Sequence, residues 1–303
     1  MTKAWNKRRR FRSGDSEYLL DDDDLTAWME EGGSSKGARV FTLPDEVVLE
    51  GRTYRITSLG SGTYRSDEDT GIEELTVPDS YEYIDEYALE RAPLKTVRLG
   101  KGMMYVHPWA FKAATDDFQL FIDPENPHIK LSDDGNMVLS KSGTELICLL
   151  KDVKDLVIPE GVEDIQGEAI SCTSRLTHIK FPSTLKRIRV DGIIQNESLK
   201  SLVIPEGVTE IQTQALATND ALEEVDLPST LQHLCEDAFM DDFRLRRLIL
   251  RMPDVLPCAY AYYTTDPLYE ICHLVVPRKL LPAYRMHPAW GWFRHIDILE
   301  DNT

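Results

Sequence analysis

The chain has 303 residues, of which 42% are hydrophobic and 28% charged, a balance that is typical of a folded protein and excludes a disordered one. Its net charge of −18 argues against nucleic acid as a partner, because binding to phosphates requires a surplus of lysine and arginine. No run of about 18 consecutive apolar residues occurs, so no membrane insertion is expected.

Residues 1–38 are predicted to form a disordered or loosely capping N-terminal arm. The basic cluster Lys7-Arg8-Arg9-Arg10-Phe11-Arg12 is followed by the acidic cluster Asp21-Asp22-Asp23-Asp24. The basic cluster could contact an anionic surface or nucleic acid, but the favoured interpretation is either a solvated tail or a tail folded against the acidic cluster. Five apolar residues could form a short amphipathic helix that caps the first coil: Leu19, Leu20, Leu25, Trp28 and Met29.

The same segment bears on localisation. A secretory signal requires an apolar stretch after its basic region, whereas polar residues 13–17 follow here. The chain as given is therefore expected to be cytoplasmic, unless a signal was removed from it.

Residues 39–118 are predicted to hold N-terminal repeats. Ile72-x-x-Leu75-x-Val77-Pro78 returns as Leu94-x-x-Val97-x-Leu99, and Phe41-Thr42-Leu43-Pro44 is expected to open the array. The last two apolar residues of each motif are two apart, so in a strand both face one side and the residue between them faces the other.

Residues 119–152 break this period and are predicted to form an irregular hairpin insert. The segment from Leu131 to Leu139 favours two short strands around a turn. Asp133, Asp134 and Asn136 superficially suggest calcium, but the alternating ligands and later glutamate of a calcium loop are absent, so a turn is favoured.

Residues 153–250 carry regular 23-residue repeats. Prolines recur at positions 159, 182, 205 and 228, each after a motif such as Leu199-x-x-Leu202-x-Ile204. A fixed period of this length is typical of a solenoid, in which each coil buries its apolar face only against its neighbours. We expect a right-handed coil with a parallel sheet on one face and short turns or helical pieces on the other.

A second period of 46 residues runs through this array. Leu156-Val157-Ile158-Pro159-Glu160-Gly161-Val162 returns as Leu202-Val203-Ile204-Pro205-Glu206-Gly207-Val208, whereas the intervening coils share Pro-Ser-Thr-Leu at 182–185 and 228–231. The region therefore has the pattern of a duplicated pair of coils.

Residues 251–303 are predicted to form an irregular repeat and an aromatic cap. The last coil of a solenoid exposes an apolar end, and Trp290, Trp292 and Phe293 are expected to seal it. A second aromatic group could either cap or bind a partner: Tyr260, Tyr262 and Tyr263.

The motif L-x-x-L-x-[IVLF]-P, followed by an apolar pair three apart and then Ala-Phe or Ala-Leu, resembles the BspA-like, or Treponema pallidum type, leucine-rich repeats of bacteria. Ile122-Asp123-Pro124-Glu125-Asn126-Pro127 and the ending Trp290-Gly291-Trp292-Phe293 are similar to segments common in such proteins from gut and oral Bacteroidetes. The resemblance implies a bacterial solenoid at the cell surface or secreted, with a role in adhesion. The chain differs from common leucine-rich repeats in lacking the Asn or Cys of L-x-x-N/C-x-L.

No enzyme motif is found, and neither a cofactor nor a metal site is expected. The seven histidines show no metal-binding spacing, and no phosphate-binding or nucleophile motif occurs. The five cysteines have neither C-x-x-C pairs nor an even count, so they are expected to be reduced, with a Cys258–Cys272 bridge as the alternative.

The functional hypothesis is a non-catalytic module that binds a protein partner through the strand face of the solenoid. Alternatives are an intracellular scaffold or regulator, and a carbohydrate or ligand site built on the C-terminal aromatics. The candidate contact residues on the strand face are Arg98, Val157, Lys180, Val203, Asp226 and Ile249 in one column, and His178, Glu224 and Arg247 in the neighbouring one. Tyr260, Tyr262 and Tyr263 complete the set.

Overall fold

A computed structural model of the chain describes residues 8–32, 38–61, 63, 71–89, 93–111, 117–235, 237–257 and 267–300. The chain divides into two compact units, Met1–Ser142 and Gly143–Thr303. This boundary lies inside the insert expected at residues 119–152. Within the described ranges, no helix is long and apolar enough to cross a membrane.

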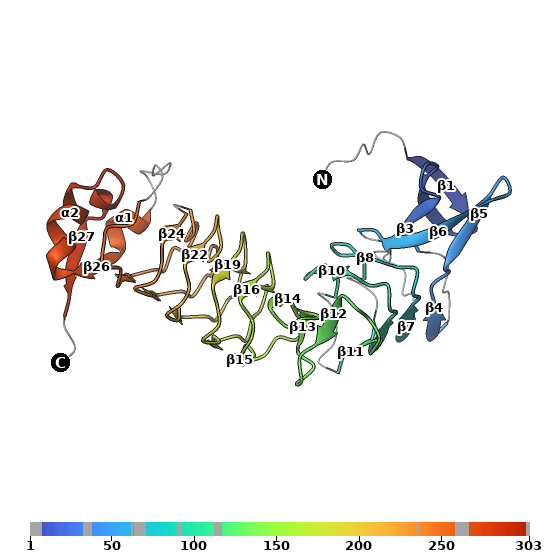
Figure 1. Cartoon of the computed structure of the whole chain (residues 1–303), viewed down its shortest axis with the longest axis horizontal. Helices are drawn as coiled ribbons and strands as arrows, with labels where there is room; N and C mark the ends of the chain where they lie inside the picture. Colours follow the sequence, from blue (N-terminus) through green and yellow to red (C-terminus); the bar gives the residue numbers. More distant parts are fainter. Residues whose placement is uncertain are drawn as a thin grey trace. The chain divides into compact units, whose positions relative to one another are not determined.

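The first unit opens with three antiparallel strands, β1 (Arg9–Ser13), β2 (Ser16–Asp21) and β3 (Thr26–Glu31) (Figure 1). The prediction of a disordered arm with a capping helix is therefore wrong for residues 8–32. Buried and less buried residues alternate along β2 and β3, which is the period of a strand rather than of a helix. The acidic cluster at 21–24 supplies the turn between these strands.

The arginines of β1 are ion-paired with acidic residues of the same unit. Arg9 lies 3.2 Å from Asp22, within the acidic cluster, and Arg12 lies 2.8 Å from Glu31. These pairs support the interpretation that the basic cluster folds against acidic side chains of the chain itself.

Two sheets hold the remaining coils of the first unit. One sheet continues from the first three strands with β6 (Arg52–Leu59), β8 (Tyr83–Ile84) and β10 (Tyr105–Val106), in the order β1-β2-β3-β6-β8-β10. Strand β5 (Glu46–Leu49) also pairs with β6. The other is parallel and contains β4 (Val40–Thr42), β7 (Glu74–Val77), β9 (Thr96–Leu99) and β11 (Gln119–Ile122). Its register places Leu75 beside Val97, as the repeat predicts.

The predicted hairpin of the insert is present as β12 (Ile129–Leu131) and β13 (Met137–Ser140), which pair antiparallel. The carboxylate of Asp134 accepts hydrogen bonds from the hydroxyl of Ser132 at 2.6 Å and from the backbone N–H of Asn136 at 3.0 Å. The Asp134 side chain is thus occupied by turn contacts, which supports the turn over a calcium loop.

In the second unit each 23-residue coil contributes a strand to each of two sides (Figure 1). The first side holds β15 (Asp155–Val157), β18 (His178–Lys180), β21 (Ser201–Val203), β23 (Glu224–Leu227), β25 (Arg247–Leu250), β26 (His273–Pro277) and β27 (His295–Leu299). The second side holds β14 (Glu145–Leu149), β16 (Asp164–Ile165), β19 (Arg187–Ile188), β22 (Glu210–Ile211) and β24 (His233–Leu234). The return path also contains β17 (Ile170–Ser171) and β20 (Ile193–Ile194) and otherwise consists of turns.

The register confirms the predicted stacking of coils. Leu156 pairs with Ile179 between β15 and β18, and Val225 pairs with Leu202 and with Leu248 around β23. Between β18 and β21 the strands contact each other, but no ladder of hydrogen bonds joins these two described strands. The core is the column of apolar side chains that these strands turn inward.

The second unit ends in a helical segment followed by the last strand. Its helices are α1 (Pro267–Ile271), η2 (Arg278–Leu280), α2 (Leu281–Met286) and η3 (Trp290–Trp292). Strand β26 pairs in parallel with β25 and with β27, so the strand half of the repeat continues to the C-terminal end.

Candidate functional site

The candidate surface is the solvent side of β15, β18, β21, β23 and β25, which we call the strand face. Alternation along each strand turns Leu156 and Leu202 inward and leaves Val157 and Val203 pointing outward. Val157 is 57% exposed and Val203 is 67% exposed. A valine side chain this exposed buries little of its apolar surface in the core, so it adds little to the stability of the fold. Val157 and Val203 therefore present apolar surface to water.

Lys180 lies in the same column as the two valines. It is exposed and pairs directly with Val157 across the β15–β18 ladder, while β18 also contacts β21, which carries Val203. In the neighbouring column His178 Nδ1 lies 3.1 Å from Asp155 Oδ1, so His178 is held by the strand beside it. The structure thus brings Val157, Lys180 and His178 together on two adjacent strands.

The charged candidates farther along the strand face are held in ion pairs. Glu224 and Arg247 are directly paired residues of β23 and β25, with 3.5 Å between Oε2 and Nε. Asp226 accepts two hydrogen bonds of 2.7 Å from the guanidinium of Arg251, and this contact raises the pKa of Arg251. Arg251, which the sequence analysis left out, follows β25 directly and fixes the position of Asp226.

Ile249 does not belong to this surface. It occupies the outward column of β25, but it is only 5% exposed, and Val275 beside it on β26 is 4% exposed. The expectation that Ile249 contacts a partner is therefore wrong, because this end of the column is covered within the folded chain. Alternation within a strand determines the side of a residue but not whether that side reaches water.

Arg98 lies in the first unit, on the outward side of β9. Its guanidinium carbon lies 4.5 Å above the ring centroid of Phe121, which pairs with Arg98 from β11 and is itself exposed. Phe121 is a candidate that the sequence analysis missed. The signal was present, since Leu120-Phe121-Ile122 has the same alternation as the other strands, but the segment was assigned to the irregular insert.

A model of the BspA-type leucine-rich repeat region matches residues 54–125 and 148–254 in six copies. The chain belongs to the BspA-type leucine-rich-repeat family. Comparison with curated proteins found no significant match.

Among solved structures, this BspA-type chain is similar to the pneumococcal vaccine antigen PcpA, with 14% sequence identity, coverage of 96% of this chain and 99% of that chain, and a TM-score of 0.42. A leucine-rich repeat protein from Eubacterium ventriosum shows 14% identity, coverage of 81% and 79%, and a TM-score of 0.47. The T. pallidum leucine-rich repeat protein shows 16% identity, coverage of 79% and 81%, and a TM-score of 0.29.

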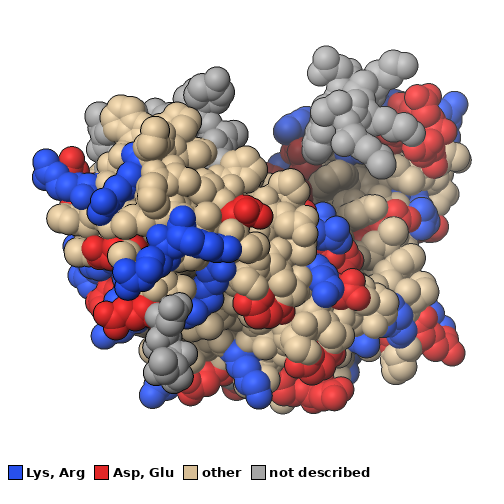
Figure 2. All heavy atoms as spheres, turned by 60° about the vertical axis from the view of Figure 1, so that its left-hand side comes forward, with Lys and Arg blue, Asp and Glu red and all other residues tan. Residues whose placement is uncertain are grey.

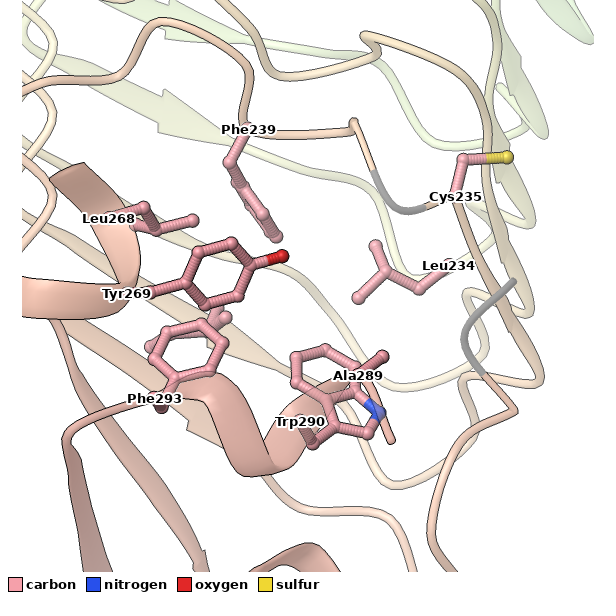
Figure 3. Close-up of a pocket in the computed structure, with 9 residues that line it drawn as sticks. Leu234, Cys235, Phe239, Leu268, Tyr269, Ala289, Trp290 and Phe293 are labelled. Atoms are coloured by element: carbon pink, nitrogen blue, oxygen red, sulfur yellow. The ribbon is translucent and has the colours of Figure 1, made fainter. Parts of the chain in front are cut away.

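The C-terminal end of the BspA-type array is sealed by aromatic side chains (Figure 3). Trp290 and Phe293 are each 5% exposed, and the Trp290 indole N–H donates to the Leu256 carbonyl at 3.1 Å. The ring centroids of Tyr269 and Phe293 are 5.0 Å apart. Trp292 differs, because it is 51% exposed, so the expectation that it helps to seal the end is wrong.

This packing bears on the expectation of a ligand site among the C-terminal aromatics. Trp290 and Phe293 are buried among Leu234, Phe239 and Leu248, so their faces are not open to a sugar ring. The candidates Tyr260, Tyr262 and Tyr263 lie outside the described residues.

Cysteines, histidines and carboxylates are the side chains that could hold a metal ion or act in catalysis. No group of three or more such side chains within the described ranges is arranged to hold a metal ion. Cys148, Cys172, Cys235 and Cys272 are free thiols, and Cys258 lies outside the described residues. Burial raises the pKa of Cys148 and of Cys272 to about 12, which keeps both thiols protonated and unreactive.

Proposed function

We propose that this BspA-type repeat protein is a non-catalytic module that binds a protein partner through the strand face of its second unit. The observation that carries the proposal is the exposure of Val157 and Val203 on either side of Lys180, in one column of parallel strands. Burying one valine side chain at an interface contributes about 1.5–3 kcal/mol. Two such anchors around a cation fit a partner surface with apolar and acidic groups.

The paired charges of the strand face support a role in specificity. Glu224 and Asp226 already have cationic partners in the free chain. A binding partner therefore contacts carboxylates that are already held in ion pairs. A protein whose charged groups lie opposite groups of the same sign on the strand face would bind more weakly, which gives specificity. Membership of the BspA-type family further supports a repeat interaction module. If the protein is exported, we propose an adhesin-like role on a host or matrix protein.

The test begins with a photo-crosslinking amino acid placed at Val203, and at Val190 as a control. Val190 is also an exposed valine of the second unit, 43% accessible, but it lies outside the strand-face column. Cell lysate and host matrix are the two sources in which a partner is sought. A protein that is crosslinked to the variant with the crosslinker at Val203, but not to the variant with it at Val190, is then purified. Fractionation of the source cell then shows which source is relevant.

The dissociation constant of that partner is measured by calorimetry for Val203→Glu and Val190→Glu. We expect Val203→Glu to weaken binding about 10-fold or more, because a carboxylate replaces an apolar contact, and Val190→Glu to leave it unchanged. Undiminished binding by a Val157→Glu/Val203→Glu double variant would refute the proposal.

A further inference from the structure

The helical segment before the last strand exposes two large apolar side chains. Met286, the last residue of α2, is 86% exposed, and Trp292, the last residue of η3, is 51% exposed. The neighbouring aromatics Tyr284, Trp290 and Phe293 are buried. Since three aromatics already seal this end, the exposure of Trp292 and Met286 is not needed for capping.

Trp292 is held in place rather than left free. Its indole N–H donates to the Pro288 carbonyl at 2.6 Å, so the polar edge of the ring is satisfied within the chain. A Cβ at Gly291 would lie 2.8 Å from the Arg285 carbonyl oxygen, so only glycine allows η3 to approach α2 this closely. The Trp292 ring is therefore a preorganised apolar anchor, which reduces the entropy lost on binding.

Three cations lie in η2 and α2, the two consecutive helices that end at Met286, and α2 in turn contacts η3, which carries Trp292. Arg278 and Lys279 of η2 and Arg285 of α2 are exposed, and no described carboxylate lies within ion-pair distance of any of the three. Residues 267–300 carry four Lys or Arg and three Asp or Glu, a net charge of +1 in a chain whose net charge is −18. Two of these carboxylates are already paired, Glu270 with Arg294 and Asp297 with His273. Figure 2 shows Lys and Arg side chains gathered on the side of the molecule that is turned forward there.

We propose that this cationic patch, defined by Arg278, Lys279, Arg285, Met286 and Trp292, binds an acidic protein segment that carries apolar side chains. Tryptophan, methionine and arginine are enriched at the centres of protein interfaces, whereas most other charged residues are depleted there. The carboxylates of such a segment pair with the three free cations, and its apolar side chains cover Trp292 and Met286.

Charge decides between a short segment and an extended anionic surface. A nucleic acid or an anionic membrane is a polyanion, and the chain's net charge of −18 disfavours its approach. A short acidic peptide bound at the patch interacts mainly with charges within the Debye length, about 8 Å at physiological salt. These are the charges of the patch itself. The geometry therefore favours a peptide-sized partner, on a surface separate from the strand face.

The probe is a fluorescent 15-residue peptide of five Glu-Glu-Leu repeats, measured by fluorescence anisotropy on the full chain. A Glu-Glu-Ser repeat peptide and vesicles of phosphatidylcholine with 30% phosphatidylglycerol are the comparison ligands. We expect the Leu peptide to bind, with an affinity that falls between 50 and 200 mM salt, and the Ser peptide to bind about 10-fold more weakly.

The Met286→Ser/Trp292→Ser variant should weaken binding of the Leu peptide about 10-fold or more. It should keep its far-UV circular dichroism and its cooperative unfolding, because Met286 is 86% exposed and Trp292 is 51% exposed. Val203→Glu should bind the peptide as the parent does, so failure here is distinguishable from failure of the strand-face proposal. No binding of the Leu peptide, equal binding by the double variant, or binding of the vesicles in place of the peptide would overturn the proposal.

Discussion

At the scale of single residues, Asn196 and Asn219 lie 23 residues apart and are fully buried. The Asn196 side-chain amide donates to Asn219 Oδ1 at 2.9 Å, and the Asn219 backbone N–H donates to Asp242 Oδ1 at 2.7 Å. Thr173 begins the same column by donating to Asn196 at 2.7 Å. This polar ladder connects successive coils in the turns that precede the first-side strands.

The ladder was visible in the sequence and was missed. Common leucine-rich repeats carry their asparagine or cysteine inside L-x-x-N/C-x-L, and this chain has none there. Asn196 and Asn219 instead precede Leu199 and Leu222 by three residues, in the same 23-residue register as the prolines. Polar residues in a fixed register carry as much information as apolar ones, because a buried amide requires a partner in the next coil.

Replacing Asn219 by alanine should destabilise the second unit by about 2–4 kcal/mol. The substitution leaves the carbonyls of Ile193 and Leu216 and the amide of Asn196 without their buried partner. Urea unfolding followed by circular dichroism measures the loss. Gln232→Ala, at an exposed position of the next coil, is the control and should change the free energy of unfolding by less than about 0.5 kcal/mol.

At the scale of structural elements, the turn after each first-side strand explains the 46-residue period. The carboxylate of Glu206 accepts hydrogen bonds from the Ser229 backbone N–H and hydroxyl, and the Gly207 N–H donates to Thr230 Oγ1 at 2.9 Å. Glu160 makes the same contacts with Ser183, which lower the pKa of Glu160. Pro-Glu-Gly and Pro-Ser-Thr turns are therefore complementary. They alternate along the array because the glutamate and glycine of one turn form hydrogen bonds with the serine and threonine of the next.

The glycine of the Pro-Glu-Gly turn is required by its backbone. Gly207 has φ +103°, which side-chain-bearing residues rarely adopt, and an added Cβ would meet its neighbours only at 3.6 Å or more. Gly207→Ala should therefore cost about 1–3 kcal/mol through backbone strain rather than through a clash. Gly161→Ala, at φ +100°, should cost a similar amount in urea unfolding, and an unchanged midpoint in both variants would contradict this explanation.

The N-terminal strands show where element prediction failed. The sequence analysis interpreted the charge clusters at 7–12 and 21–24 as signs of disorder and gave no weight to the alternation of Tyr18 and Leu20 or of Ala27 and Met29. Charges on the outward side of a short meander are compatible with a fold, because they form ion pairs within it. Arg10 and Arg12 pair with Glu17 and Glu31 on the next two strands, and Arg9 pairs with Asp22 in the turn between those strands.

At the scale of the whole molecule, the 23-residue period was sufficient to predict the stacking of coils and their inward columns, and the resemblance of the repeat motif indicated the family. The period was not sufficient to predict which outward positions reach solvent. Val203 and Ile249 have identical positions in the repeat, yet one is exposed and the other buried. The burial of an outward position depends on tertiary packing, which a repeat pattern does not encode. The same holds for the exposure of Trp292 beside the buried Trp290.

The most direct test of the account is a pair of deletions compared by urea unfolding of the second unit. Removing residues 182–227 joins Phe181 to Pro228, so that Ser229 and Thr230 take the places of Ser183 and Thr184 against Glu160 and Gly161. Coils that stack in register tolerate this loss of two complete periods, and we expect a folded chain with cooperative unfolding. Removing residues 182–193 takes away half a coil and should abolish cooperative unfolding of the second unit. Equal stability of the two deletions would contradict the stacking of coils on which the fold and the strand face both depend.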